Sequence, residues 1–142
     1  MIASGTTRLS AGMGGLADVA MGFADPVHDA QRTFRQVLEA LSRPGVVQRL
    51  SIAARSSPSA PEAIAATGLP SEGVAALLLT LTDAETSLFM TPACASPRAR
   101  RYLSFHTGVR EAERADTADF IVAHGNELDA HSLDAFEFGT DE

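Results

Sequence analysis

No lysine occurs in this chain, because all 11 basic residues among its 142 positions are arginine. Without a lysine amine, the chain cannot form a Schiff base, use a lysine general base or hold phosphate with a P-loop lysine. A pyridoxal-phosphate enzyme is therefore excluded outright. No other motif indicates a cofactor, and we predict none.

Cysteine is nearly absent, because Cys94 stands alone and no disulfide can form within the chain. A single thiol suits a reducing compartment, so we expect a cytoplasmic protein. The longest apolar run, residues 74–79, is far shorter than the about 20 residues that span a bilayer. The N-terminus offers only Arg8 as a positive charge, so neither a signal peptide nor a membrane anchor is expected.

Positive charge is scarce in the second half of the chain, and the net charge is -7. Residues 1–72 balance six arginines against six acids, whereas residues 73–142 carry five arginines and twelve acids. This acidity disfavours nucleic acid as a partner. Within this acidic half of the chain, Arg98, Arg100 and Arg101 form a basic cluster. The cluster lies on a solvated helix face, forms a salt bridge to the acidic tail, or makes bidentate contacts with phosphate or carboxylate.

The composition divides the chain into a flexible N-terminal arm, residues 1–20, and a single α/β domain, residues 21–142. Residues 1–15 are rich in glycine, serine and threonine and have no periodicity, which is typical of a loosely packed segment. The glycine-rich residues 12–15 do not predict a phosphate loop, because no strand precedes them and no lysine follows.

Asp25 and Pro26 predict the start of a first helix, as N-cap and first helical residue, and Pro44-Gly45 predicts its end. One face of this helix is apolar and carries Val27, Ala30, Phe34, Leu38 and Leu41. We expect burial of that face. The other face is polar and carries His28, Arg32, Arg35, Gln36 and Glu39.

The remaining elements alternate between short apolar strands and helices. Residues 46–52 are predicted to be a strand, residues 53–62 a surface loop, and residues 73–82 a helix capped by Ser71. There follow a strand at 86–91, a helix from Pro97 to 105 or 106 capped by Ser96, a strand at 119–123 and a final helix at 127–136. This alternation predicts an α/β sheet covered by helices. A further strand is expected beyond the last helix, so the sheet looks unfinished at the C-terminus.

His124, Glu127 and His131 are spaced by three and four residues, which on one continuous helix would suit a metal site. Gly125 and Asn126 are expected to separate His124 from the helix that carries Glu127 and His131. The sequence therefore favours a solvated surface and no metal site.

His106 follows Tyr102 and Phe105 near a predicted helix end. It is either a C-capping residue favoured by the helix dipole or an anion-binding or proton-transferring group. No catalytic residue is predicted, because there is no G-x-S-x-G motif, Cys94 has no charged neighbour in sequence and the acids are scattered.

Three segments, in order, resemble the PhnH family, a subunit of the bacterial carbon–phosphorus lyase machinery. Residues 22–45, GFADPVHDAQRTFRQVLEALSRPG, resemble its opening segment. Residues 77–83, LLLTLTD, with Thr86, resemble its second helix and turn, and residues 102–108, YLSFHTG, its FHT segment. The resemblance covers about residues 22–139.

The resemblance implies a three-layer α/β/α sheet like the large domain of pyridoxal-phosphate-dependent transferases, without the cofactor lysine. It also implies a homodimer that joins the PhnG, PhnI and PhnJ subunits. By the same resemblance, the complex is expected to displace adenine from ATP with a phosphonate, and a radical iron–sulfur subunit to cleave the C–P bond later. Glycosyl transfer is attributed chiefly to PhnI, so this chain is expected to be an accessory subunit. About the last third of the family's length is expected beyond Glu142.

The positions that match the family's motifs give the candidate ligand-binding residues, which are Asp25, Gln31, Arg35, Phe105, His106 and Thr107. Our hypothesis is that Arg35 and His106 meet at the end of the sheet and bind an anionic group. Two alternatives stay open. One is a small independent enzyme acting on an anionic metabolite with His106 and Arg100 or Arg101, and the other is a binding module using Arg35 and His106.

Overall fold

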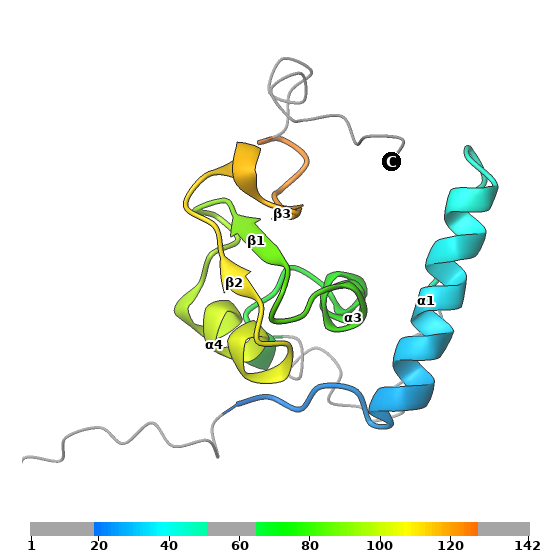
Figure 1. The fold of residues 1–142 in the computed structure, drawn as a ribbon, viewed down its shortest axis with the longest axis horizontal. Helices are drawn as coiled ribbons and strands as arrows, with labels where there is room; N and C mark the ends of the chain where they lie inside the picture. The colour runs from blue at the N-terminus through cyan, green and yellow to red at the C-terminus, as the bar shows by residue number, and fades with distance from the viewer. Residues whose placement is uncertain (1–18, 51–64, 128–142) are drawn as a thin grey trace, which may run out of the picture.

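The computed structural model describes residues 19–50 and 65–127. In chain order, the elements are α1 (Pro26–Ser42), α3 (Glu72–Leu81), β1 (Ser87–Met90), α4 (Pro97–His106), β2 (Arg110–Glu111), the 3-10 helix η2 (Ala115–Thr117) and β3 (Phe120–Val122) (Figure 1). None of the helices in these ranges combines the length and apolar character that crossing a membrane requires.

The three strands form a parallel sheet in the order β2-β1-β3. Leu88 is aligned with Glu111 on one side and with Phe120 on the other. Helix α4 connects β1 to β2, and the chain then crosses β1 through η2 to reach β3. Parallel strands joined by such crossovers confirm the predicted α/β class.

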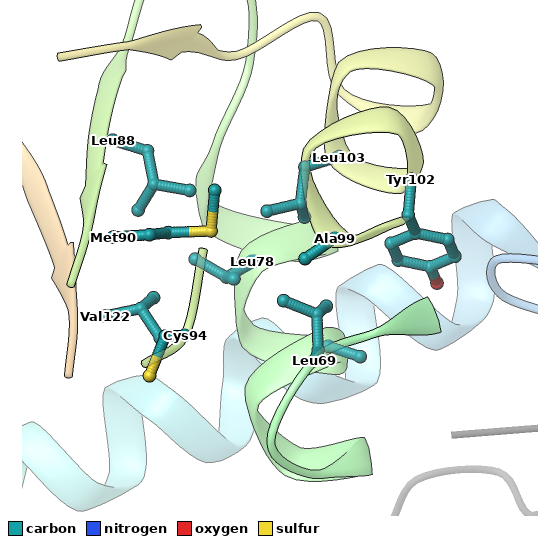
Figure 2. Close-up of a cluster of buried hydrophobic side chains, with 10 residues drawn as sticks. Leu69, Leu78, Leu88, Met90, Cys94, Ala99, Tyr102, Leu103 and Val122 are labelled. Atoms are coloured by element: carbon teal, nitrogen blue, oxygen red, sulfur yellow. The ribbon is translucent and has the colours of Figure 1, made fainter. Parts of the chain in front are cut away.

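The core lies between the sheet and helices α3 and α4 (Figure 2). Leu88 and Met90 alternate with half-buried residues along β1, as the period of two in a strand requires. Their side chains pack with Leu78 of α3 and Leu103 of α4. Leu88 and Leu103 are each only 1% exposed, and burying a leucine fully contributes roughly 1.5–3 kcal/mol.

The three longer helices begin where the sequence predicts. The side chains of Asp25, Ser71 and Ser96 each accept a hydrogen bond from a backbone N–H in the first turn of α1, α3 and α4. Proline occupies the first turn of α1 and of α4. These signals are local, so they hold without knowledge of the tertiary packing.

The predicted burial of the apolar face of α1 is wrong. Helix α1 packs on α3, yet the residues it buries are Asp29 and Thr33. The large side chains of the predicted apolar face are between 45% and 73% exposed, namely Val27, Phe34, Leu38 and Leu41. We call these four residues the α1 stripe. Ala30, at the edge of the stripe, is half-buried. The stripe is exposed because α3 contacts a different, more polar face of the helix.

Several strand and loop predictions also differ from the structure. The described part of the predicted strand 46–52, residues 46–50, belongs to no strand, and Val47 is 91% exposed. It pairs with no strand of the sheet, and pairing is what defines a strand. The sequence missed β2 and η2. The predicted loop 53–62 and nearly all of the final helix 127–136 lie outside the described residues, while Glu127 itself lies in a turn.

Of the predicted N-terminal arm, the described residues Val19 and Ala20 pack against the core. They bring the segment that precedes α1 beside the C-terminal end of α4, where Ala20 contacts His106.

Candidate functional site

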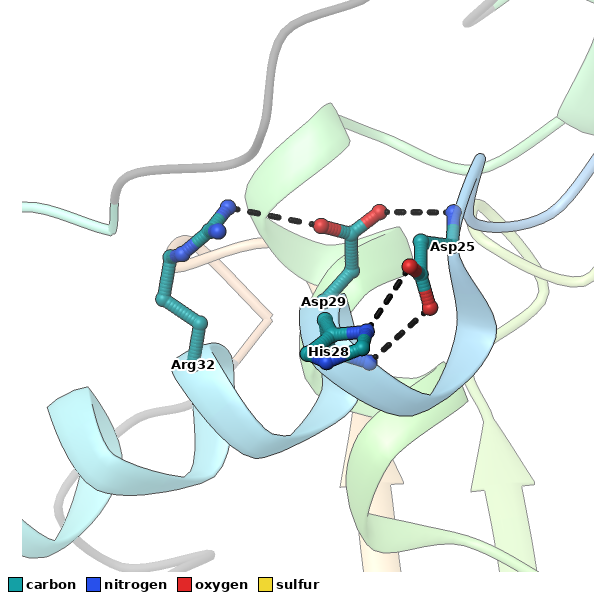
Figure 3. Close-up of polar contacts among 4 residues, drawn as sticks. All are labelled: Asp25, His28, Asp29 and Arg32. Carbon is teal, nitrogen blue, oxygen red and sulfur yellow. Dashed lines mark hydrogen bonds and ion pairs between the residues drawn. The ribbon is translucent and has the colours of Figure 1, made fainter.

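The first turn of α1 is held by a chain of polar contacts (Figure 3). Asp25 Oδ1 accepts a hydrogen bond from the His28 backbone N–H at 3.1 Å, and Asp25 Oδ2 lies 2.8 Å from His28 Nδ1. The His28 backbone N–H, helped by the imidazole, lowers the pKa of Asp25. Asp29 Oδ2 accepts from the Asp25 N–H at 3.1 Å, while Asp29 Oδ1 lies 3.4 Å from an Arg32 nitrogen. The predicted ligand residue Asp25 is thus engaged as the N-cap.

A surface groove of about 340 Å³ runs beside the polar face of α1. We call it the α1 groove, and it is lined by His28, Gln31, Arg32, Arg35, Gln36, Glu39, Gln48 and Arg49. It brings together Gln31 and Arg35, two of the predicted ligand residues. Arg35 and Arg49 have no hydrogen-bond or ion-pair partner among the described residues, whereas the Glu39 carboxylate lies 3.1 Å from Arg43.

The other predicted ligand residues lie at the C-terminal end of α4. His106 Nε2 is 2.8 Å from the carbonyl oxygen of Ala20. The His106 ring centroid is 4.6 Å from that of Tyr102 and 4.9 Å from that of Phe105, which it meets edge-on. The Thr107 hydroxyl donates to the Leu103 carbonyl at 2.9 Å and caps the helix. Through these contacts, His106 and Thr107 stabilise the C-terminal end of α4.

The structure does not bring Arg35 and His106 together. Arg35 lies on the α1 groove, whose lining comes only from α1 and the segment that follows it. His106 instead faces Ala20 and Gly22, and a Cβ atom at Gly22 would lie 3.1 Å from His106 Nδ1. No hydrogen bond, ion pair or ring contact within the described ranges joins the two side chains.

The arginine cluster at the start of α4 is largely engaged in structural contacts. Arg100 Nε lies 2.8 Å from Glu111 Oε1, so for Arg100 the structure agrees with the alternative of a salt bridge to the acids that follow. Arg98 donates to the Ala65 carbonyl oxygen at 3.2 Å. Arg101 lines a hollow next to Arg100, but the Glu111 carboxylate lines it too and opposes an anion there.

Glu127 is held by hydrogen bonds at the end of the described chain. Its Oε2 accepts from the Thr91 hydroxyl at 2.7 Å and from the His124 backbone N–H at 2.8 Å. These two donors, the hydroxyl first, lower the pKa of Glu127. Residues 19–50 and 65–127 contain no group of three histidine, cysteine or acidic side chains that could hold a metal ion, and His131 lies outside those ranges.

Sequence reasoning found part of the α1 groove and missed the rest. The helical spacing already placed His28, Arg32 and Arg35 on one polar face. Gln48 and Arg49 were missed because residues 46–52 were predicted to enter the sheet. The signal that could have placed them is Pro44-Gly45, since Gly45 adopts φ +88° and lets the chain reverse after α1.

The described residues therefore define an α/β domain with a parallel sheet and an arginine-lined groove on its first helix. The family model for the bacterial phosphonate metabolism protein PhnH matches residues 21–142, and the chain belongs to this family. The predicted resemblance is confirmed.

The chain is also similar to the alpha-D-ribose 1-methylphosphonate 5-triphosphate synthase subunit PhnH of Rhizobium meliloti (strain 1021). The two are 34% identical over 120 residues, which cover 84% of this chain and 54% of the relative. The chain thus spans about half the length of this curated relative.

Proposed function

We propose that this chain is an accessory subunit of the carbon–phosphorus lyase system. It supports the transfer of a phosphonate to the ribose C1 of ATP, with release of adenine. The family match supports this role, and so does the relative, which is named as a subunit of a synthase that makes a ribose phosphonate triphosphate. The partners proposed for it are PhnG, PhnI and PhnJ, and a second copy of the chain in a homodimer. The proposed location is the cytoplasm.

The observation that carries this proposal is the exposure of the α1 stripe. The stripe consists of Val27, Phe34, Leu38 and Leu41, and these large side chains recur at helical spacing along one side of a well-capped helix. Exposed apolar side chains aligned on one side of a helix are typical of protein–protein interfaces. The stripe therefore fits a partner that presents an apolar patch of its own.

The proposed chemistry places the reaction on the assembled synthase and not on this chain alone. The chain has no lysine for the chemistry of pyridoxal-phosphate enzymes. Asp25, His106 and Thr107 make the structural contacts described above. We propose that the domain has the three-layer architecture of the large domain of those enzymes without their cofactor. The parallel sheet, with α3 and α4 packed against one face, accounts for two of those three layers.

Co-purification tests the subunit assignment. The tagged chain is expressed in a bacterium grown on methylphosphonate, and captured proteins are identified by mass spectrometry. The wild-type chain should retain the other synthase subunits. A double variant, Phe34→Ser with Leu38→Ser, should lower their recovery by about tenfold or more, because buried apolar anchors carry much of the binding energy.

Met21→Ser is the matched control, because Met21 is 72% exposed and lies before α1. It should leave recovery unchanged. Thermal unfolding should show that all three proteins remain folded, since the substituted side chains lie outside the core. If the wild-type chain captures no synthase subunit, the subunit assignment is rejected. If it captures them and the double variant does so equally well, the stripe is not the docking surface.

A further inference from the structure

The α1 groove concentrates positive charge on an acidic chain. Arg32, Arg35 and Arg49 line it together with the single acid Glu39, although the whole chain carries a net charge of -7. We propose that this groove is a binding site for a phosphorus oxyanion, either a phosphate chain or a phosphonate. The charges and geometry of the groove point to an anion, and the choice of a phosphorus oxyanion rests on the proposed function.

Two features of the chain build the groove. The first is helical spacing, which places His28, Arg32 and Arg35 on one side of α1. The second is the reversal after the helix, where Gly45 has φ +88° and the Val46 N–H donates to the Arg43 carbonyl oxygen at 3.1 Å. The reversed segment forms the opposite wall of the groove with Gln48 and Arg49. Two stretches that the turn joins therefore supply separate cations to one groove.

The acids around the groove are already engaged. Asp25 holds His28, Asp29 lies 3.4 Å from Arg32, and Glu39 lies 3.1 Å from Arg43. Arg35 and Arg49 have no partner among the described residues. The two guanidinium groups thus remain available for an anion that approaches from solvent. Glu39 is the one carboxylate in the lining, and a carboxylate repels an anion. Its ion pair with Arg43 reduces that repulsion.

The donors in the groove match the oxygens of a phosphate or phosphonate. A guanidinium group presents a planar fork of N–H donors that contacts two oxygens of one tetrahedral anion. The side-chain amides of Gln31 and Gln48, which also line the groove, add neutral donors. Since Arg35 and Arg49 come from different segments, a ligand with several linked anionic groups can engage both. A polyphosphate should therefore bind more tightly than a single phosphate.

Calorimetric titration of the full chain tests the site with defined probes. Inorganic tripolyphosphate, inorganic phosphate and methylphosphonate are titrated separately at low salt. We expect saturable binding, tightest for tripolyphosphate, that weakens as salt is added. Affinity for methylphosphonate above that for inorganic phosphate would assign the site to phosphonates, and the reverse order would assign it to phosphates.

Charge-neutral variants locate the site. Arg35→Gln and Arg49→Gln should each weaken tripolyphosphate binding by about tenfold, because each removes a charge-assisted contact. Arg114→Gln is the matched control. It removes the same charge from an arginine that is paired with Asp116 beside η2 and lies outside the groove, so binding should stay within about twofold of wild type.

Three results would overturn the proposal. The first is no saturable binding of any probe by the wild-type chain. The second is equal weakening by Arg114→Gln and Arg35→Gln, which would mean that net charge alone attracts the anion. The third is stronger binding of an acidic peptide such as oligoglutamate, displacing tripolyphosphate, which would make the groove a protein-docking surface. None of these titrations involves another synthase subunit, so failure here is distinct from failure of the co-purification.

Discussion

Asp119 ties β3 to β1 through a reciprocal set of hydrogen bonds with Ser87. The Asp119 carboxylate oxygen Oδ2 accepts from both the backbone N–H and the hydroxyl of Ser87, each at 2.7 Å. The Ser87 Oγ in turn accepts from the Asp119 N–H at 3.1 Å. The two residues are 32 positions apart and lie at the start of two paired parallel strands. The contact therefore helps to fix the register of β3 against the central strand β1.

This contact predicts a pH-dependent contribution to stability. The hydroxyl and the N–H of Ser87, in that order, lower the pKa of Asp119 below its ordinary value of 3.8. A depressed carboxyl pKa stabilises the folded state above the unfolded-state pKa and loses that effect as pH falls through the folded-state pKa. The contribution should be fully present near neutral pH and decline below about pH 4.

Asp119→Asn should therefore lower the thermal midpoint at pH 7, and it should lower the midpoint by less at pH 3. Thermal unfolding of both proteins at several pH values measures the difference. Glu113→Gln serves as the control, since it removes an equal charge from a side chain with no hydrogen-bond partner among the described residues. A difference between Asp119→Asn and wild type that stays constant from pH 7 to pH 3 would contradict the account.

Leucines in the core and on the α1 stripe should respond differently to truncation. Leu103 is 1% exposed, so Leu103→Ala should lower the free energy of unfolding by about 2–5 kcal/mol. Leu38 is 49% exposed, so Leu38→Ala should change it by no more than about 0.5 kcal/mol. Urea unfolding measures both. A large loss for Leu38→Ala in the isolated chain would mean that the stripe is covered within this chain.

Gly68 should tolerate no side chain, because it contacts the N-cap of α4. It adopts φ +74°, and an added Cβ would lie 2.4 Å from Ser96 Oγ and 2.9 Å from the Ala99 nitrogen. The unfavourable φ alone should cost Gly68→Ala about 1–3 kcal/mol of unfolding free energy. Ser96→Ala, which removes the cap, should cost about 0.5–2 kcal/mol.

The two substitutions act on one contact, so the double variant should lose less than the sum of the single losses. Chemical unfolding of the two single variants and the double variant gives the comparison. A neutral Gly68→Ala would show that this approach of the two segments does not exist in solution.

The parts of the fold that the sequence predicted correctly rest on local signals. Asp25, Ser71 and Ser96 each sit before a helical pattern, and their capping hydrogen bonds need only the next few residues. The strands around Leu88 and Ile121 are short runs of β-forming residues between turns. In contrast, β2 consists of Arg110 and Glu111, both exposed, and only their pairing with β1 makes them a strand. A strand of two exposed residues is too short to show a hydrophobic periodicity in the sequence.

The candidate site shows the same division. Helical spacing shows that Gln31 and Arg35 share a face, and the structure places both on the α1 groove. The spacing also identifies the apolar face of α1, but it cannot tell whether that face is covered by its own chain or by a partner. The hypothesis that Arg35 and His106 meet required knowledge of how α1 and α4 are placed in the fold, which helical spacing does not give. In the structure, His106 contacts Ala20 instead. The aromatic neighbours of His106 in sequence, Tyr102 and Phe105, therefore predicted its surroundings better than its possible charge did.

Hydrogen–deuterium exchange on α1 tests most directly the claim that its apolar stripe docks on another synthase subunit. The full chain is measured alone and after mixing with the purified partner subunits. The account predicts slower exchange of amides within residues 27–41 in the mixture, and loss of that protection when Phe34 and Leu38 are both changed to serine. Unchanged exchange across α1, with protection appearing on other segments of the chain, would contradict it.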